Sequence, residues 1–339
     1  MVLAHVTDAW TRDADRHAEP FYTLIFIAGV ASPLFLFLAG VATSLSAASK
    51  GRQAGDARAG ARFARRRGWE IFALGLVFRV QSQLLGWGPI DNLFKVDMLN
   101  TMGLSMVAVS YVWQFADSRH RRVAIVASAA VAIAMLTPIV RSLTWLAPLP
   151  DRLEAYLRPA GSYAAFPLFA WSGFLVAGAL VGELVDAVRT RPDRQLLLQN
   201  GLAIGGGAAV ALGWIASFQP AIYESANFWR DSPTFFFIRL GLVTMLVPIA
   251  WVCEQLLPSR VFRPLVTLGR ASLFVYWIHV EMVYGVMAEP IKRQLPLWAT
   301  VAGTALLAIA LYWIVLLKNR LLERYDLRGG WRLLAPVVR

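Results

Sequence analysis

Long apolar stretches separated by short polar loops run along the chain from Phe21 to Leu317. A helix needs about 20 apolar residues to cross the roughly 30 Å hydrocarbon core of a bilayer, and nine stretches meet that length. One soluble core cannot bury so many. The pattern therefore predicts an all-α, polytopic transmembrane helical bundle that forms a single integral-membrane domain over residues 1–339. The predicted spans are residues 23–47, 69–87, 97–115, 123–140, 164–184, 197–217, 233–253, 266–288 and 295–317.

The composition supports this class. Hydrophobic residues make up 58% of the chain, and the mean hydropathy is +0.54. The longest loops, residues 48–68 and 141–163, are too short to bury a core of their own. Cys253 is the only cysteine in the sequence, which excludes an intrachain disulfide.

Lys and Arg gather in alternate loops, and this alternation predicts an orientation. Loops rich in these residues face the cytoplasm under the positive-inside rule. We expect a multi-pass protein of the plasma (inner) membrane with a cytoplasmic C-terminus and with residues 1–22 outside. Contacts with anionic lipid, rather than with nucleic acid, then explain the net charge of +12, and an additional anionic ligand such as a nucleotide is the alternative. The basic segments are residues 50–67, 119–122, 189–194, 260–270 and 318–339.

The N-terminus predicts the remnant of a further helix. Residues 1–10 are mostly apolar, follow no basic segment and are too short for the apolar core of a signal peptide. An odd number of spans places this end outside, whereas a chain without a cleavable signal more naturally begins inside. We expect residues 1–10 to be the outer end of a truncated first helix, through a start codon assigned too late or a clipped chain.

Two arginines lie within predicted spans, where ionisable side chains are costly and need partners. Arg79 falls near mid-membrane, and it either forms a structural ion pair or binds an anionic group in a polar cavity. Arg239 follows three phenylalanines near the outer face, and it either extends to the lipid headgroups or contacts substrate.

Further polar groups occur in the outer halves of spans. Asp97 and Asn100 open the third span on one helix face, where they either cap the helix or face an outer cavity. In the eighth span, His279 and Glu281 favour a polar cavity, with hydrogen bonding between helices as the alternative.

Two histidines near the N-terminus are candidates for acid–base chemistry. His5 has Asp8 one turn further along its helix, and His17 lies in the polar segment that leads into the next span. A histidine oriented by a carboxylate can act as a general base or carry an acyl group. A solvated surface position is the other interpretation of His17.

Six regions, in order along nearly the whole chain, carry a more specific signal. They are Met1–Asp8, Pro33–Gly40, Arg65–Gly68 with Leu74–Leu76, Val96–Gly103, Phe166–Gly173 and Leu268–His279. Their order resembles the heparan-α-glucosaminide N-acetyltransferase-like family of membrane acyltransferases, particularly its bacterial members. That resemblance implies a bundle of membrane helices that moves an acetyl group from cytosolic acetyl-CoA to an amine or hydroxyl of a sugar on the far side.

The resemblance also implies roles for individual residues. His17 falls close to the family's proposed catalytic histidine, and His5 falls where the family has a polar residue at the outer end of its first helix. We expect His17 or His5 to deprotonate the acceptor or to carry the acetyl group, with Asp8 or Asp97 orienting it. Acetyl-CoA is the expected co-substrate, and no metal is expected. The expected substrate-binding residues are Asn100, Arg239, His279 and Glu281, and the expected cofactor-binding residues are Arg65, Arg66, Arg67 and Arg79.

The expected function is therefore a transmembrane acetyltransferase that modifies an extracytoplasmic sugar or glycan. Its expected partners are membrane lipid, that glycan and a second copy of the chain. A transporter or carrier of a lipid-linked or small anionic substrate is the alternative, because Pro33 and Pro248 are placed to break helices as transporters do. A membrane scaffold without catalysis is a third interpretation. Consumption of acetyl-CoA distinguishes the acetyltransferase from both the transporter and the scaffold.

Overall fold

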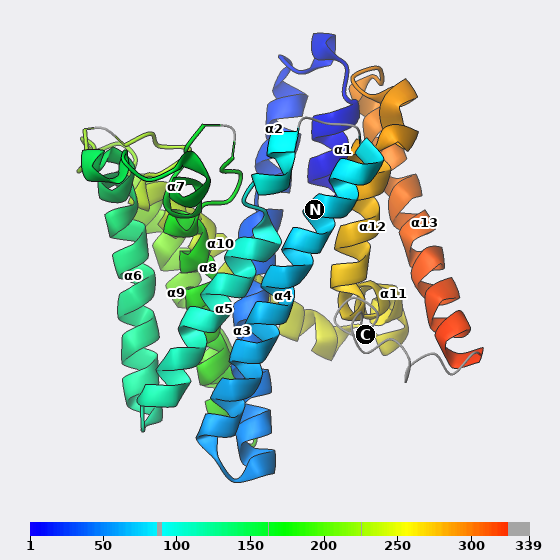
Figure 1. Cartoon of the computed structure of the whole chain (residues 1–339). Coiled ribbons are helices and arrows are strands. Elements are labelled where there is room, and N and C mark those ends of the chain that lie inside the picture. Colours follow the sequence, from blue (N-terminus) through cyan, green and yellow to red (C-terminus); the bar gives the residue numbers. More distant parts are fainter. Residues whose placement is uncertain (87–89, 162, 225, 325–339) are drawn as a thin grey trace. The chain divides into compact units, whose positions relative to one another are not determined.

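A computed structural model describes residues 1–86, 90–161, 163–224 and 226–324 of the chain (Figure 1). The described residues form helices joined by turns, which confirms the all-α class. The predicted span 69–87 ends on a residue that lies outside the described part. The α-helices are α1 (Val2–Trp10), α2 (Glu19–Ala28), α3 (Ala31–Ala54), α4 (Ala57–Gly86), α5 (Met98–Phe115), α6 (Arg119–Ser142), α7 (Asp151–Leu157), α8 (Leu168–Val188), α9 (Pro192–Ala216), α10 (Pro233–Leu256), α11 (Ser259–Arg270), α12 (Ser272–Tyr284) and α13 (Leu297–Arg324).

Six segments of the described chain are long and apolar enough to cross a membrane, compared with nine predicted spans. They are the α2–α3 segment Glu19–Ala54 and the helices α6, α8, α9, α10 and α13. The helices α4, α5 and α12 do not meet both conditions, because α12 is short and the other two carry more polar residues. The chain is an integral, multi-pass membrane protein on this evidence.

The prediction of one continuous eighth span over residues 266–288 is wrong. The structure ends α11 at Arg270 and α12 at Tyr284, and a short 3-10 helix, η4 (Val286–Ile291), follows. Arg260, Arg263 and Arg270 lie on one side of α11, and Val261, Leu265 and Leu268 lie on the other. A helix with such a charged side cannot be surrounded by lipid, so the apolar run that begins at Leu265 does not continue straight through the membrane.

The described residues form two compact units. Unit 1 draws on the described residues of 1–31, 81–86 and 254–324. Unit 2 draws on those of 32–80 and 90–253. Each unit has its own core and its own polar cluster.

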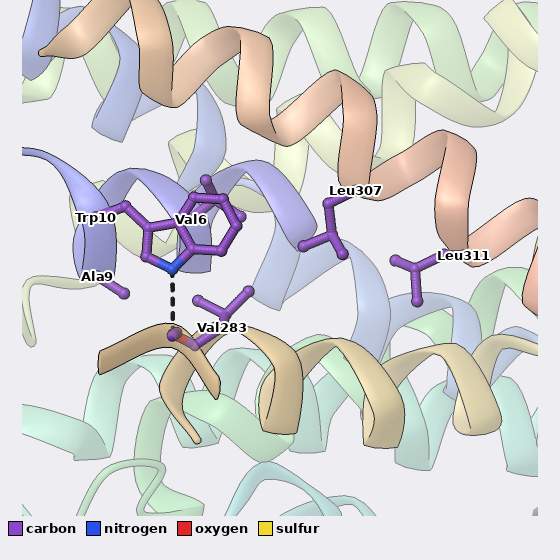
Figure 2. Close-up of a cluster of buried hydrophobic side chains, with 7 residues drawn as sticks. Val6, Ala9, Trp10, Val283, Leu307 and Leu311 are labelled. Atoms are coloured by element: carbon purple, nitrogen blue, oxygen red, sulfur yellow. Dashed lines mark hydrogen bonds between the residues drawn. The ribbon is translucent and has the colours of Figure 1, made fainter. Parts of the chain in front are cut away.

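In unit 1, α1 packs against α12 and α13, and α12 also contacts α13. Figure 2 shows the apolar side chains that these helices share, among them Val6, Trp10 and Leu311. The indole Nε1 of Trp10 donates a hydrogen bond to the carbonyl oxygen of Val283 at 3.2 Å, which fixes the end of α1 on α12. Residues 2–10 are thus a packed helix, as their apolar pattern predicts.

In unit 2, α8 is the central helix, with contacts to α5, α6, α7 and α9. Its backbone also touches that of α3, because both helices have glycine where they meet. A Cβ atom built on Gly178 would lie 1.9 Å from the carbonyl oxygen of Phe37, and one on Gly40 would lie 1.9 Å from that of Leu175. Ser44 uses the close approach to donate from its hydroxyl to the carbonyl oxygen of Ala179 at 2.7 Å. Small residues that let helix backbones meet are a common packing device in membranes.

We therefore expect Gly178→Ala to push α3 and α8 apart and to destabilise the protein by about 1–3 kcal/mol, as overpacking does. Gly205→Ala in α9 is the matched control, because a Cβ there meets nothing within 4 Å. It should be neutral or stabilise by up to about 1 kcal/mol through helix propensity. Thermal unfolding in detergent, followed by tryptophan fluorescence, measures both; equal melting temperatures would contradict the close approach.

Candidate functional site

A pair of histidines joins α1 to α12 in unit 1. The Nδ1 atom of His5 lies 3.0 Å from the Nε2 atom of His279, and the two rings stack with centroids 5.0 Å apart. The Nδ1 atom of His279 in turn lies 2.6 Å from the carbonyl oxygen of Val275, one helical turn earlier. His279 is 1% exposed, so its ring is held entirely by protein.

These contacts fix where the protons of the two neutral rings lie. The carbonyl oxygen of Val275 can only accept, so Nδ1 of His279 carries the hydrogen and its Nε2 is left as an acceptor. The Nδ1 atom of His5 must then donate to that acceptor. The Nε2 atom of His5 consequently has a lone pair, and no other described residue hydrogen-bonds to it. A neutral imidazole held in this state presents Nε2 as a hydrogen-bond acceptor.

Asp8 lies at the same end of α1 and borders the histidine pair. Its Oδ2 accepts from the hydroxyl of Tyr284 at 3.0 Å, and the Tyr284 ring meets the His5 ring edge-on at 5.5 Å. The guanidinium of Arg16 donates to the Asp8 carbonyl oxygen at 2.6 Å and to Oδ1 at 3.3 Å. Asp8 thus positions Tyr284, while His279 is the group that hydrogen-bonds to His5.

His17 lies in an exposed turn between the 3-10 helix η1 (Asp13–Asp15) and α2. This turn is tied to the start of α13. The backbone amide of Leu297 donates to Asp15 at 2.8 Å, and this bond, with the Arg12 guanidinium, lowers the pKa of Asp15 from its ordinary value. His17 is therefore solvent-accessible on a fixed segment.

Glu281 follows His279 on α12, but its side chain does not join the histidine pair. Its Oε1 atom is buried and has no hydrogen-bond partner in the described part of the chain. A buried carboxylate oxygen without a donor is unusual and marks a place where a ligand group can donate.

A second polar cluster lies in unit 2, at the start of α5. Arg79 forms an ion pair with Asp97, in which Nη2 of Arg79 lies 3.2 Å from Oδ2 of Asp97. Asp97 is the N-cap of α5 and accepts from the Met98 amide at 2.5 Å, while Asn100 accepts from the Asp97 amide at 3.1 Å, completing a capping box. Asn100 also donates to the carbonyl oxygen of Phe72 at 3.2 Å. The ion-pair interpretation of Arg79 and the capping interpretation of Asp97 and Asn100 are both confirmed.

We expect Arg79→Gln or Asp97→Asn alone to destabilise the protein by about 3–5 kcal/mol, because each leaves a buried charge unpaired. The double variant should recover part of that loss. Denaturant unfolding in detergent micelles measures the coupling. Arg152→Gln is the control, because its ion pair with Asp91 is half-exposed at 3.8 Å and should contribute less than about 1 kcal/mol. Strict additivity of the two single losses would contradict the pairing.

The three arginines predicted to bind a cofactor lie along α4. Arg65 packs over the ring of Tyr111 at 5.0 Å and hydrogen-bonds to Gln114 of α5. Arg66 and Arg67 both donate to Glu70, at 3.0 Å and 3.5 Å. Glu70 thus offsets part of the charge of this basic cluster.

A larger charged cluster, which sequence reasoning missed, converges on α8. Glu183 and Asp186 lie one turn apart there, and their side chains are 2% and 3% exposed. Asp186 pairs with Arg52 at 2.7 Å and with Arg119 at 2.8 Å, and Glu183 pairs with Arg122 at 3.2 Å. The signal in the sequence was two carboxylates in an apolar segment that has two basic loops to pair with.

This cluster lines a cavity of about 380 Å³. Small residues such as Ala47 and Gly51 form part of its wall, and the indole of Trp113 donates to Glu183 at 2.6 Å beside it. The side chains of Arg52 and Arg119 are 43% and 41% exposed. Each guanidinium has five N–H donors, so both retain donors for a phosphate. The cavity lies in the size range of ligand sites.

Comparisons with known proteins place this geometry in context. A family model described as "Heparan-alpha-glucosaminide N-acetyltransferase, catalytic" matches residues 1–210. That range contains the histidine-bearing helix α1, the Arg79 ion pair and the charged cavity of α8. The comparisons with curated proteins and with solved structures gave no match.

Proposed function

The chain belongs to the heparan-α-glucosaminide N-acetyltransferase catalytic family, and from that premise we propose the reaction and its direction. The protein transfers an acetyl group from cytosolic acetyl-CoA to an amine or hydroxyl of a sugar or glycan on the extracytoplasmic side. This proposal places the basic loops and the C-terminus in the cytoplasm, as the charge alternation predicts.

The observation that carries the mechanism is the hydrogen-bonded chain from Val275 through His279 to His5. It leaves Nε2 of His5 as a neutral base with a fixed orientation, which general-base catalysis requires. His279 is buried and acts as the positioning residue rather than as the base. From the sequence we expected His279 to contact substrate, whereas in this proposal it orients His5.

In the proposed step, the acceptor nitrogen or oxygen attacks the thioester carbonyl carbon, and the new bond forms as the carbon–sulfur bond breaks. His5 Nε2 takes the proton of the acceptor and returns it to the departing thiolate, so free CoA leaves as the thiol. His17, close by in sequence and exposed, is the second candidate for this proton transfer or for a transient acetyl-histidine. Glu281 Oε1 would accept a hydrogen bond from an acceptor hydroxyl.

The donor site that we favour is the cavity of Arg52, Arg119 and Arg122. Two basic loops meet there, and an aromatic side chain lies beside the arginines. The carboxylates of Glu183 and Asp186 hold the guanidinium groups in place while leaving outward donors for the phosphates of the nucleotide. Arg65, Arg66 and Arg67 are the alternative donor site.

We expect His5→Ala to reduce acetyl transfer by a factor on the order of 10² to 10⁴, the usual contribution of a general base. His279→Gln should lower kcat more than it raises KM and should shift the pH–rate profile. The reason is that His5 would no longer be held in a single tautomer by His279. His120→Ala, in the first turn of α6, is the matched histidine control and should be unaffected. Release of CoA thiol by the purified protein with an amino-sugar acceptor measures all three. Full activity of both His5→Ala and His17→Ala would reject the assignment.

Binding of labelled acetyl-CoA distinguishes the two donor sites without requiring knowledge of the acceptor. We expect Arg52→Gln with Arg119→Gln to weaken binding at least tenfold. Arg121→Gln, an exposed arginine paired only with nearby Asp117, should not. If only the Arg65→Gln/Arg66→Gln/Arg67→Gln variant lost binding, the donor site would instead lie on α4. Saturable transport of a substrate without release of CoA would reject the acetyltransferase proposal and show that the protein is a carrier.

A further inference from the structure

A smaller cavity lies in unit 2 among residues of α6, α8 and α10 and the turn before α10. Its volume is about 30 Å³, and its wall includes Thr137, Trp171, Ser232, Phe235 and Arg239. A space that holds one water needs about 10–15 Å³ on this measure. The cavity therefore accommodates a group of two or three atoms, while a larger ligand would have to extend through its opening.

Arg239 is the unusual member of this wall. Its guanidinium lies 4.0 Å from the centre of the Phe235 ring, and no carboxylate of the described residues forms an ion pair with it. Asp231 also lines the cavity, but it accepts from Arg141 at 3.1 Å and from the Asn227 amide at 2.6 Å. Arg79 shows the contrast, since its charge is compensated by Asp97. A half-buried guanidinium is stabilised by an anion, and the described residues do not pair one with Arg239.

Two other polar groups of the wall can donate, whereas the Thr137 hydroxyl already donates to the carbonyl oxygen of Ile133 at 2.6 Å. The hydroxyl of Ser232 accepts from the Thr234 amide at 3.2 Å, which leaves its own hydrogen free to donate. Arg230 adds a second guanidinium to the lining. The donors outnumber the acceptors, which is the composition of an anion site.

The backbone of α8 is strained at the same place. Ala170 has φ of 78° and ψ of −49°, and it lines the cavity. A residue other than glycine in the left-handed region costs of order 1–3 kcal/mol, and such strain gathers at ligand sites. The regular helix resumes at Trp171, which also lines the cavity.

We propose that this cavity binds the carboxylate group of a soluble ligand, with Arg239 as its counter-ion and Ser232 as a second donor. The aromatic walls at Trp171 and Phe235 suit the carbon skeleton that bears the carboxylate. If that ligand is the acetyl acceptor, this inference rests on the proposed function and makes the acceptor an acidic sugar. Binding of the carboxylate can be measured without acetyl transfer.

The test uses the full chain in detergent with glucuronate as the probe and glucose as its uncharged counterpart. We expect glucuronate to raise the melting temperature saturably and to bind measurably by calorimetry, whereas glucose does neither. Arg239→Gln should abolish both effects, and Arg239→Lys should weaken binding at least tenfold, because an ammonium cannot form the paired bonds of a guanidinium. Arg152→Gln is the matched control, since Arg152 also lies over a phenylalanine ring, that of Phe94 at 3.8 Å, but does not line this cavity.

Three results would overturn the proposal: equal effects of glucose, retention of glucuronate binding by Arg239→Gln, or a response to inorganic phosphate and anionic-lipid nanodiscs but not to glucuronate. The last would assign Arg239 to a lipid headgroup. Should Arg239→Gln fail to fold, Arg239→Lys decides, because unchanged affinity there excludes the paired contact. Glucuronate binding without acetyl transfer would reject the proposed function alone, and transfer without glucuronate binding would reject this inference alone.

Discussion

The structure depends on the requirement that a charge inside a membrane protein be compensated where it lies. Hydrocarbon cannot solvate an ion, so a guanidinium or carboxylate in a spanning helix must find its partner in the protein. Arg79 pairs with Asp97, and the two carboxylates of α8 pair with three arginines from α3 and α6. Each of these pairs joins two different helices, so the same constraint also specifies which helices pack together.

The polar clusters divide into those that are complete and those that are not. The charges of the Arg79–Asp97–Asn100 group are compensated and Asp97 caps its helix, although Nε of Arg79 has no hydrogen-bond partner in the described part of the chain. The His5–His279 pair, Glu281 and Arg239 each retain an unused donor or acceptor. An unused polar group inside a protein is costly, and it persists where a ligand supplies the missing partner. The proposals for the acceptor side of the reaction rest on the groups that retain an unused donor or acceptor, while the proposed donor site rests on arginines that are already paired but keep outward donors.

Much of the fold could be predicted because its determinants are local. Apolar length identifies spanning segments, and the Asp97–Asn100 spacing encodes a cap that forms within one turn. The contact between His5 and His279 could not be predicted, because it joins residues 274 positions apart and depends on how α1 packs on α12. The broken eighth span was missed for a different reason: the apolar run from Leu265 onward carries no signal for the break between α11 and α12 at Ala271.

The shortness of α12 has a consequence for the lipid around it. Its 13 residues rise only about 20 Å, whereas the hydrocarbon layer is about 30 Å thick. The bilayer must thin beside this helix, or headgroups and water must descend to its ends. Either adjustment brings aqueous solvent towards the ring of His279 and its partner without a dedicated channel. Acyl-chain length in the surrounding lipid would then set how deep the His5–His279 pair lies below the membrane surface.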